Sequence, residues 1–262
     1  MHIIVCVKQV PGSNQVAVDP VTGVLKRDGV AAKLNPYDLF ALEAAFALAE
    51  QTGGQVKTLS MGPPQAKEAL METLWMGADE GFLLSDRKLG GADVAATSYA
   101  LSLGVRAMGA YDLILCGKQT TDGDTAQVGP ELAERLGIDH AANVLRIDAV
   151  TADSVTVTME LDGALQRQRM LLPCLLTIDK DVNTPRLPSF RRKQAVDAQA
   201  LLRVLCADDL GADEARLGLK GSPTQVERIF PPEKNLNKQM LTGDSRTLAN
   251  ALYARIREQK FV

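Results

Sequence analysis

The hydrophobic pattern in the first half of the chain alternates short apolar runs with longer amphipathic segments. Three apolar runs lie at residues 3–7, 82–84 and 113–116, and a further strand is expected at residues 56–61. Continuous runs of this kind are typical of parallel strands that are covered on both faces. Segments with apolar residues at helical spacing follow them and begin near residues 36, 64, 93 and 130. This alternation predicts an α/β fold with a doubly wound, mostly parallel sheet.

The pattern changes to strict alternation of apolar and polar residues at 155–159. The alternating stretch leads into Asp162 and Gly163, a pair suited to a tight type I′ turn. The pattern therefore predicts an antiparallel hairpin, followed by one more core strand at residues 171–178. A smaller hairpin is expected at residues 16–27, where turn residues separate short β-branched stretches.

Beyond Lys180 the chain is rich in turn residues and short of long apolar runs. Loops of this length are uncommon within a compact domain. We therefore expect a domain at residues 1–180 and an extended C-terminal arm at residues 181–262 that wraps another subunit. A terminal helix is predicted within residues 244–261. The apolar side chains expected to contact the other subunit are Phe230, Leu236, Leu252 and Phe261.

Composition and charge exclude several classes of protein. Apolar residues make up 46% and charged residues 23% of the chain, as in an ordinary globular protein. The formal net charge of −3 removes the long-range attraction on which nucleic-acid and anionic-membrane binders rely. No stretch approaches the ~18 apolar residues needed to span a bilayer, and the N-terminus lacks the basic start of a signal peptide. We expect a cytoplasmic protein with no nucleic-acid partner and no membrane insertion.

Residue types that carry hydrolytic or metal chemistry are scarce. The four cysteines form no CxxC pair, and His2 and His140 are the only histidines. This leaves little material for a metal site or for a nucleophile activated by histidine. We expect neither catalytic side chains nor metal ligands.

The most informative segment is a polar, glycine-containing loop between the apolar run at 113–116 and the next helix. It consists of Gly117, Lys118, Gln119, Thr120, Thr121, Asp122, Gly123, Asp124, Thr125, Ala126, Gln127 and Val128. Glycines let backbone N–H groups approach a ligand closely, and the unpaired N–H groups of a helix N-terminus favour phosphate. Neither a Walker A pattern nor GxGxxG is present, so composition alone fits a solvent-exposed connection equally well.

The position of this loop favours a ligand site. Four segments follow the carboxyl ends of predicted strands or begin the next helix, at residues 6–10, 35–38, 60–62 and 117–128. In a doubly wound sheet such segments gather at the crevice where ligands bind. We expect an adenine nucleotide there, with its base bonded to backbone groups and its phosphates at the loop.

The chain resembles the beta subunit of electron-transfer flavoproteins in motifs that occur in order over nearly its whole length. They are VKQVP at 7–11, NPYD at 35–38, SMGP at 60–63, MGAD at 76–79, GKQ at 117–119, DGDTAQVG at 122–129, LP at 172–173, PR at 185–186 and DDLG at 208–211. The resemblance implies an α/β fold of the adenine-nucleotide-binding type. It also implies a heterodimer with an alpha subunit that holds one FAD, and a role in carrying electrons between dehydrogenases and an acceptor.

Carried over position by position, the resemblance implies a set of nucleotide-binding residues and a docking loop. The nucleotide set is Cys6, Asn35, Pro36, Tyr37, Asp38, Met61 and residues 117–128. Tyr37 matches an aromatic position near the flavin of the alpha subunit, and packing on a helix face is its alternative role. Residues 185–193 resemble a recognition loop for an acyl-CoA dehydrogenase-type flavoenzyme. Leu187 and Phe190 are candidate anchors with Arg191 beside them, although Phe190 could instead cover the domain's own core.

Two branches of the family differ in the ligand of the beta subunit. Conventional members hold AMP, whereas electron-bifurcating members hold a second FAD and use NADH. The loop at 122–129 and the segment at 219–224 resemble the bifurcating branch. The small residues Gly123 and Ala126 also leave room for a second phosphate. We therefore favour FAD over AMP, with NADH as electron donor and ferredoxin or flavodoxin as the low-potential acceptor.

Two functions of other classes fit the same fold less well. A non-redox module that senses adenine nucleotides has no need of the long arm after Lys180. An adenylating enzyme would call for an SGGxDS-type loop after the first strand, and residues 8–13 read KQVPGS instead.

Overall fold

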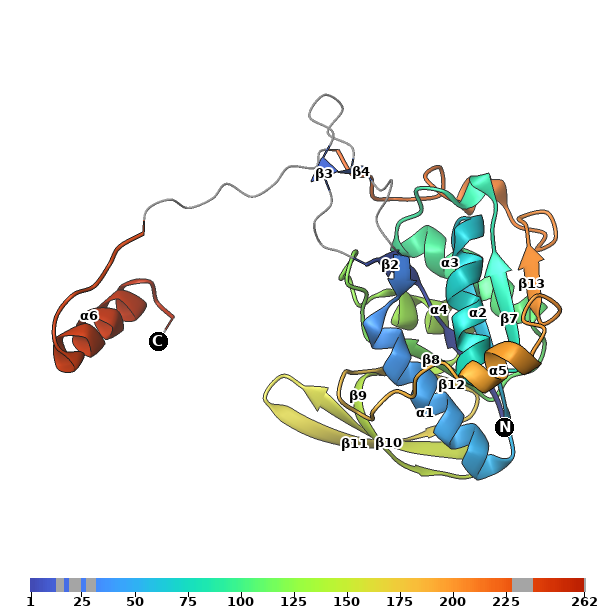
Figure 1. The fold of residues 1–262 in the computed structure, drawn as a ribbon, viewed down its shortest axis with the longest axis horizontal. Coiled ribbons are helices and arrows are strands. Elements are labelled where there is room, and N and C mark those ends of the chain that lie inside the picture. The colour runs from blue at the N-terminus through green and yellow to red at the C-terminus, as the bar shows by residue number, and fades with distance from the viewer. Residues whose placement is uncertain (13–16, 19–24, 27–31, 228–237, 262) are drawn as a thin grey trace. The chain divides into compact units, whose positions relative to one another are not determined.

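The structure is a computed structural model that describes residues 1–12, 17–18, 25–26, 32–227 and 238–261 (Figure 1). The chain divides into two compact units, Met1–Glu227 and Arg228–Val262. The first unit contains the sheet and the candidate site, and the second contains helix α6 (Ser245–Glu258). No helix in the described part of the chain combines the length and hydropathy that crossing a bilayer requires.

A nine-stranded sheet forms the centre of the first unit, in the order β11-β10-β9-β12-β8-β1-β6-β7-β13. Its strands are β1 (His2–Cys6), β6 (Gln55–Met61), β7 (Glu80–Leu84), β8 (Leu113–Gly117), β9 (Asp139–Val150), β10 (Ser154–Leu161), β11 (Ala164–Leu171), β12 (Cys174–Ile178) and β13 (Leu202–Leu205). The seven strands from β9 to β13 in this order are parallel to one another, while β10 is antiparallel to both β9 and β11. The predicted mostly parallel sheet is confirmed.

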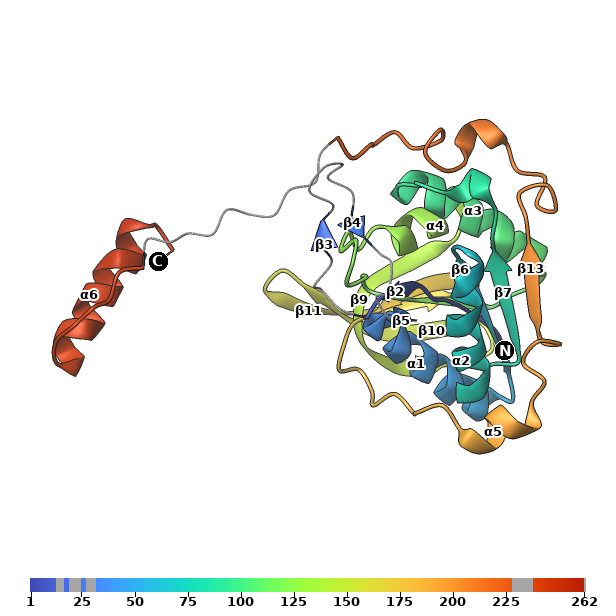
Figure 2. The same cartoon turned by 45° about the horizontal axis from the view of Figure 1, so that its top comes forward.

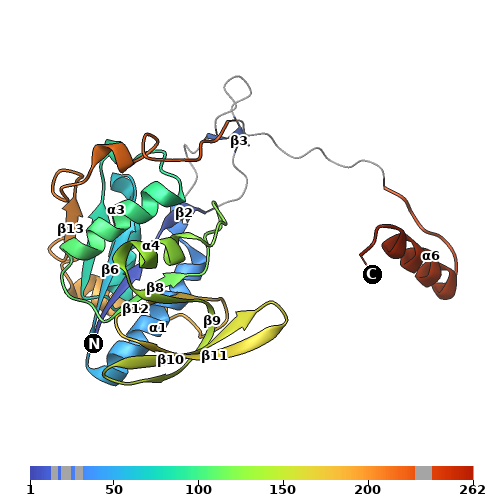
Figure 3. The same ribbon diagram turned by 180° about the vertical axis from the view of Figure 1, so that it is seen from behind.

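Helices cover both faces of the parallel part of the sheet (Figures 2 and 3). The helices are α1 (Pro36–Thr52) and α2 (Lys67–Met76) on one face, and α3 (Val94–Ala107) and α4 (Val128–Leu136) on the other. In β1, Ile3 and Val5 pack with α1 and α2, whereas Ile4 and Cys6 pack with α3 and α4. Because both faces of the strand are buried, its sequence is apolar throughout rather than alternating.

The antiparallel part of the fold also follows the sequence pattern. Asp162 and Gly163 form the turn between β10 and β11, and Gly163 has the left-handed φ of 71° that such a turn requires. Two small antiparallel pairs accompany the main sheet, β2 (Gln9–Pro11) with β5 (Ala32–Leu34) and β3 (Ala17–Val18) with β4 (Leu25–Lys26). The latter pair lies within the hairpin predicted at 16–27, whose other residues are outside the described ranges.

The remaining described elements are short. They are α5 (Phe190–Ala195) and the 3-10 turns η1 (Pro64–Ala66), η2 (Arg87–Leu89) and η3 (Glu214–Arg216). Strand β13, which lies beyond Lys180, pairs with β7 and extends the edge of the sheet. The first unit therefore includes part of the chain that the sequence analysis assigned to the C-terminal arm.

The order of the strands reverses between β1 and β8. The chain runs outward from β1 through β6 and β7 and then returns to place β8 on the opposite side of β1. Cys6 at the end of β1 lies directly beside Cys116 in β8. The carboxyl ends of these two strands form a topological switch point, which is where open α/β sheets bind ligands.

Candidate functional site

The loop that follows β8 lies at this switch point and reaches α4. Its first residues, up to Thr120, are half-buried, and the residues from Thr121 to Gln127 are exposed. Asp124 and Ala126 have φ values of 53° and 55°, a left-handed conformation that side chains with a β-carbon rarely adopt. Strained backbone of this kind is concentrated at ligand-binding and switch segments.

A close contact fixes the start of this loop. A β-carbon on Gly117 would overlap the carboxylate of Asp38 and lie 2.8 Å from the backbone nitrogen of Asp38. Because glycine has no β-carbon, the first turn of α1 rests directly on the end of β8. The glycine thus joins two segments that are far apart in the sequence.

Asn35 and Asp38 hold the loop from beneath. Asp38 accepts hydrogen bonds from the backbone N–H of Lys8 (2.8 Å) and from Nδ2 of Asn35 (2.9 Å). The same Nδ2 donates to the carbonyl of Gln119 (2.8 Å), and Oδ1 of Asn35 accepts from the N–H of Thr121 (3.3 Å). Asn35 is fully buried and Asp38 is 4% exposed. Asn35 precedes α1 as predicted, but its side chain makes no cap bond and serves the loop instead.

Burial governs the titration of this network. Burial raises the pKa of Asp38 to about 7, and the hydrogen bonds from Asn35 and Lys8 offset only part of that effect. The hydrogen bond between the Cys116 thiol and Cys6, together with burial, raises the pKa of Cys116 well above its ordinary value. Cys116 is therefore a protonated thiol at neutral pH and not a nucleophile.

Charged and polar side chains tie the outer part of the loop in place. Nζ of Lys8 pairs with Asp122 at 2.8 Å, and Nζ of Lys118 pairs with Asp179 at 2.8 Å. Nε2 of Gln119 donates to the hydroxyl of Tyr37 (3.2 Å) and to Oδ1 of Asp124 (2.6 Å). Lys8 lies in the segment 6–10 that was expected at the crevice, although it was not among the expected binding residues, and Asp179 is an addition. Both stand directly after the predicted strand ends, and this position was the signal that could have identified them.

The structure brings most of the expected nucleotide residues together. Cys6, the segment 35–38 and the loop at 117–122 meet through the contacts described above. Met61 ends β6 on the other side of β1, where it packs against the core cluster that contains Cys6 and Cys116. The segment 123–127 continues from this network to the first turn of α4.

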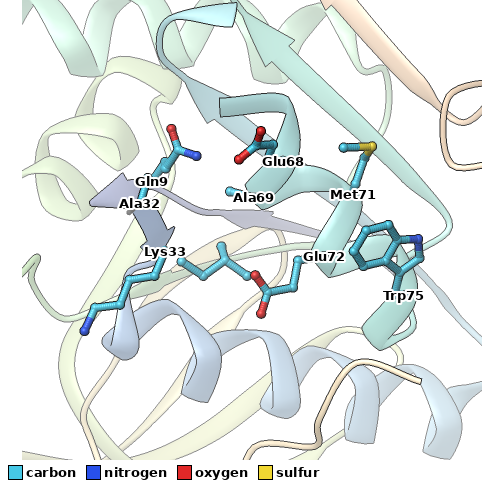
Figure 4. Close-up of a pocket in the computed structure, with 9 residues that line it drawn as sticks. Gln9, Ala32, Lys33, Glu68, Ala69, Met71, Glu72 and Trp75 are labelled. Atoms are coloured by element: carbon cyan, nitrogen blue, oxygen red, sulfur yellow. The ribbon is translucent and has the colours of Figure 1, made fainter. Parts of the chain in front are cut away.

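A separate cavity of about 280 Å³ lies between the β2–β5 pair and α2 (Figure 4). It is lined by Gln9, Ala32, Lys33, Leu34, Glu68, Ala69, Met71, Glu72 and Trp75. The carboxylates of Glu68 and Glu72 face the space between the strands and the helix, and the ammonium of Lys33 points away. Burial raises the pKa of Glu72. No residue of the loop at 117–128 lines this cavity, so it is not the crevice predicted from the sequence.

The segment resembling a recognition loop lies on the surface of the first unit. Leu187 is 85% exposed and Phe190 is 72% exposed, so Phe190 does not cover the domain's own core. Arg191 is also exposed. Ser189 caps α5 by accepting a hydrogen bond from the N–H of Arg192 at 3.3 Å. Leu187 and Phe190 therefore gain little burial within the described chain.

The second unit presents an amphipathic helix. The terminal helix is present as predicted, and Asp244 caps it through the N–H of Thr247 at 2.8 Å. Leu252 is 54% exposed and Phe261 is 79% exposed. Phe230 and Leu236, the other apolar residues expected to contact a second subunit, lie outside the described residues.

Comparison with known proteins gives a consistent result. The sequence model of the electron transfer flavoprotein domain family matches residues 22–202 of this chain. Protein FixA of Azorhizobium caulinodans is 44% identical over 98% of this chain and 94% of its own length. The electron transfer flavoprotein subunit beta of Thermoanaerobacterium thermosaccharolyticum is 41% identical, and the caffeyl-CoA reductase-Etf complex subunit CarD of Acetobacterium woodii is 40% identical, each over the full length of both chains. The chain belongs to the electron transfer flavoprotein family, among its beta subunits.

Proposed function

We propose that this chain is the beta subunit of a heterodimeric electron transfer flavoprotein that binds FAD at the switch point and takes electrons from NADH. The electrons would pass to an acyl-CoA dehydrogenase-type flavoenzyme and to a low-potential acceptor, ferredoxin or flavodoxin. The observation that carries the proposal is the strained, exposed loop at residues 123–127, which is held over the ends of β1 and β8 and leads into α4.

The donor groups of this loop fit a pyrophosphate. Within the described chain, no group accepts a hydrogen bond from the backbone N–H of Thr125, Ala126 or Gln127. Gln127 does not cap α4 with its side chain, so the positive end of the helix dipole faces the loop. Free N–H groups at a helix N-terminus favour phosphate. A β-carbon on Gly123 would meet only Oγ1 of Thr120, at 3.4 Å, so the space beside it is open.

The residues of the chain would bind and orient the cofactor. FAD, when bound, supplies the redox chemistry, accepting a hydride from NADH and passing its electrons on. The N–H groups at 125–127 would hold the phosphates, while Asn35 and Asp38 keep the loop in place beneath them. Tyr37, tied to Gln119, would lie towards the flavin of the alpha subunit.

One relative and the loop sequence support the bifurcating form of the proposal over the conventional form with structural AMP. The name of the A. woodii relative places that protein in a complex with caffeyl-CoA reductase, an enzyme of CoA-ester redox chemistry. The loop at 122–129 carries small residues where a second phosphate needs room.

The arm is proposed to hold the alpha subunit. Helix α6 has no fully buried residue within the described chain, yet Leu248, Leu252 and Ile256 recur at helical spacing. An apolar face of this kind gains stability only when another surface covers it. The alpha subunit is the partner that membership of this family implies.

A steady-state assay of the intact heterodimer tests the function. We expect NADH oxidation to require an acyl-CoA dehydrogenase with its enoyl-CoA substrate and ferredoxin together, and to be slow with either acceptor alone. NADH oxidation at full rate with the dehydrogenase alone would contradict bifurcation, and no oxidation with any acceptor would contradict the role of NADH.

A further inference from the structure

Residues 183–193 form a bridge between two helices on one face of the sheet, and α1 holds its first end. Nε and Nη2 of Arg186 donate to the two carboxylate oxygens of Glu43 at 2.8 and 2.9 Å. The backbone N–H of Arg186 donates to Glu43 as well, at 2.9 Å. Nη1 of Arg186 reaches Glu50 at 2.7 Å, and the guanidinium lies 5.0 Å from the ring centroid of Phe46. The side chain of Glu43 is only 15% exposed, so this pair is better shielded from water than an ordinary surface ion pair.

Helix α2 holds the second end of the bridge. The N–H of Ser189 donates to the carbonyl of Trp75 at 3.0 Å. Arg192 donates to the carbonyls of Leu74 (3.0 Å) and Ala78 (3.1 Å). Nζ of Lys193 lies 4.5 Å from the ring centroid of Trp75. The bonds to Leu74 and Trp75 satisfy carbonyls in the last turn of α2 that the helix itself leaves free.

Leu187 lies between these two attachments, and Phe190 lies within the second, between Ser189 and Arg192. Leu187 and Phe190 have little of their surface covered within the described chain, so their own packing cannot fix the conformation of the bridge. The bonds to α1 and α2 therefore determine it. A segment that is ordered before it meets its partner loses less conformational entropy on binding.

We propose that Glu43 is a positioning residue for docking: through Arg186 it holds Leu187 in place for the partner flavoenzyme. The inference rests on the proposed function of the recognition loop and extends it to α1. Three donors of one residue converge on a single carboxylate, whereas Glu50 contributes one contact from an exposed position. Glu43 therefore orders the bridge, and Glu50 adds little.

The matched variants are Glu43→Gln and Glu50→Gln, each purified as the heterodimer. Glutamine keeps the shape of the side chain but loses the charge and one acceptor oxygen. For Glu43→Gln we expect about tenfold faster amide hydrogen exchange at residues 186–193, with unchanged exchange in β1 and β8. The KM for a purified acyl-CoA dehydrogenase that the wild-type heterodimer reduces should rise by about tenfold, with kcat and NADH oxidation by an artificial acceptor unchanged. Glu50→Gln should change each value less than about twofold.

The outcomes separate the inference from the function on which it rests. Unchanged exchange at 186–193 in Glu43→Gln would overturn the positioning role, and so would faster exchange with an unchanged KM. If Glu43→Gln yields no soluble heterodimer, Glu43→Gln combined with Arg186→Met removes both charges, and the same exchange and KM values are expected of it. Failure of the proposed function would give a different result. The KM for the dehydrogenase would then be unaffected by Leu187→Ala and Phe190→Ala, although amide exchange at residues 186–193 still responds to Glu43→Gln.

Discussion

Gly117 and Asp38 are in direct contact, although 78 intervening positions separate them in the chain; the carboxylate of Asp38 occupies the place where a β-carbon of residue 117 would lie. This contact brings the first turn of α1 against the end of β8. It also places the buried acceptors of Asp38 beneath the loop that follows. The candidate site therefore depends on a backbone approach that only glycine permits.

Replacing Gly117 with alanine should destabilise the first unit and release the nucleotide. The new methyl group would overlap the carboxylate and backbone of Asp38, and overpacking of this kind costs ~1–3 kcal/mol. Urea denaturation of the variant measures the cost. The control is Gly123→Ala, whose β-carbon meets only Thr120, and whose free energy of unfolding should stay within about 0.5 kcal/mol of wild type. Equal stability of the two variants would contradict the contact.

A bulky residue at position 123 should block the ligand without harming the fold. Because the space beside Gly123 is open, Gly123→Phe should keep the wild-type melting temperature of the ligand-free chain but lose bound nucleotide. Gln166→Phe, on exposed strand β11, is the matched control and should retain the nucleotide. Full nucleotide content in the Gly123 variant would show that the phosphates do not bind beside residue 123.

The buried carboxyl of Asp38 predicts a pH dependence of stability. Its pKa is raised from 3.8 to about 7, so the folded state binds the proton more tightly than the unfolded state. The contribution of Asp38 to stability is then fully present below pH ~4 and is lost as the pH rises to about 7. Relative to Asp38→Asn, the wild-type protein should lose stability between about pH 4 and pH 7, on the order of a few kcal/mol, and no more above about pH 8. Denaturant titrations across this range measure the difference, and a difference that is constant with pH would show that Asp38 is ionised throughout.

Leu187 and Phe190 should act on docking and not on stability. Both side chains are largely exposed, so truncation to alanine should leave the melting temperature unchanged. Truncating a docking anchor costs on the order of 2 kcal/mol in binding, measured here as a higher KM for the dehydrogenase. Leu165→Ala on the exposed hairpin is the control and should change neither quantity. A loss of delivery that followed the melting temperature alone would argue against a docking role.

Removal of the second unit should separate the subunits. A chain that ends at Glu227 retains the whole described first unit and should fold and bind nucleotide. It should no longer co-purify with the alpha subunit at micromolar concentration, since it lacks the apolar face of α6. Co-purification of the truncated chain in a tight heterodimer would refute the role of the arm.

The parts of this fold that are encoded locally could be predicted from the sequence. The apolar runs, the caps at Asp93 and Asp244 and the turn at Gly163 each depend on neighbouring residues. Strand β13 carries no such signal, because its four residues are only partly covered at the edge of the sheet and alternate poorly. Because β13 was not recognised, the sequence suggested a boundary at Lys180, whereas the chain divides after Glu227.

The long-range contacts of the site could not be predicted in the same way. The loop at 117–128 was recognisable from its place after a strand, but the role of Asn35 as its support was not. The cap pattern suggests a bond within the first turn of α1, and only the packing of α1 on β8 directs that side chain to Gln119. The pair of Arg186 with Glu43 joins residues 143 positions apart and has no local pattern at all.

The nucleotide content of the intact heterodimer tests the central claim most directly. Acid extraction followed by chromatography measures FAD and AMP against the protein concentration. The account predicts two FAD molecules and no AMP per heterodimer, with the second FAD lost in Gly123→Phe. One FAD and one AMP per heterodimer would contradict it and identify the chain as a conventional beta subunit with structural AMP.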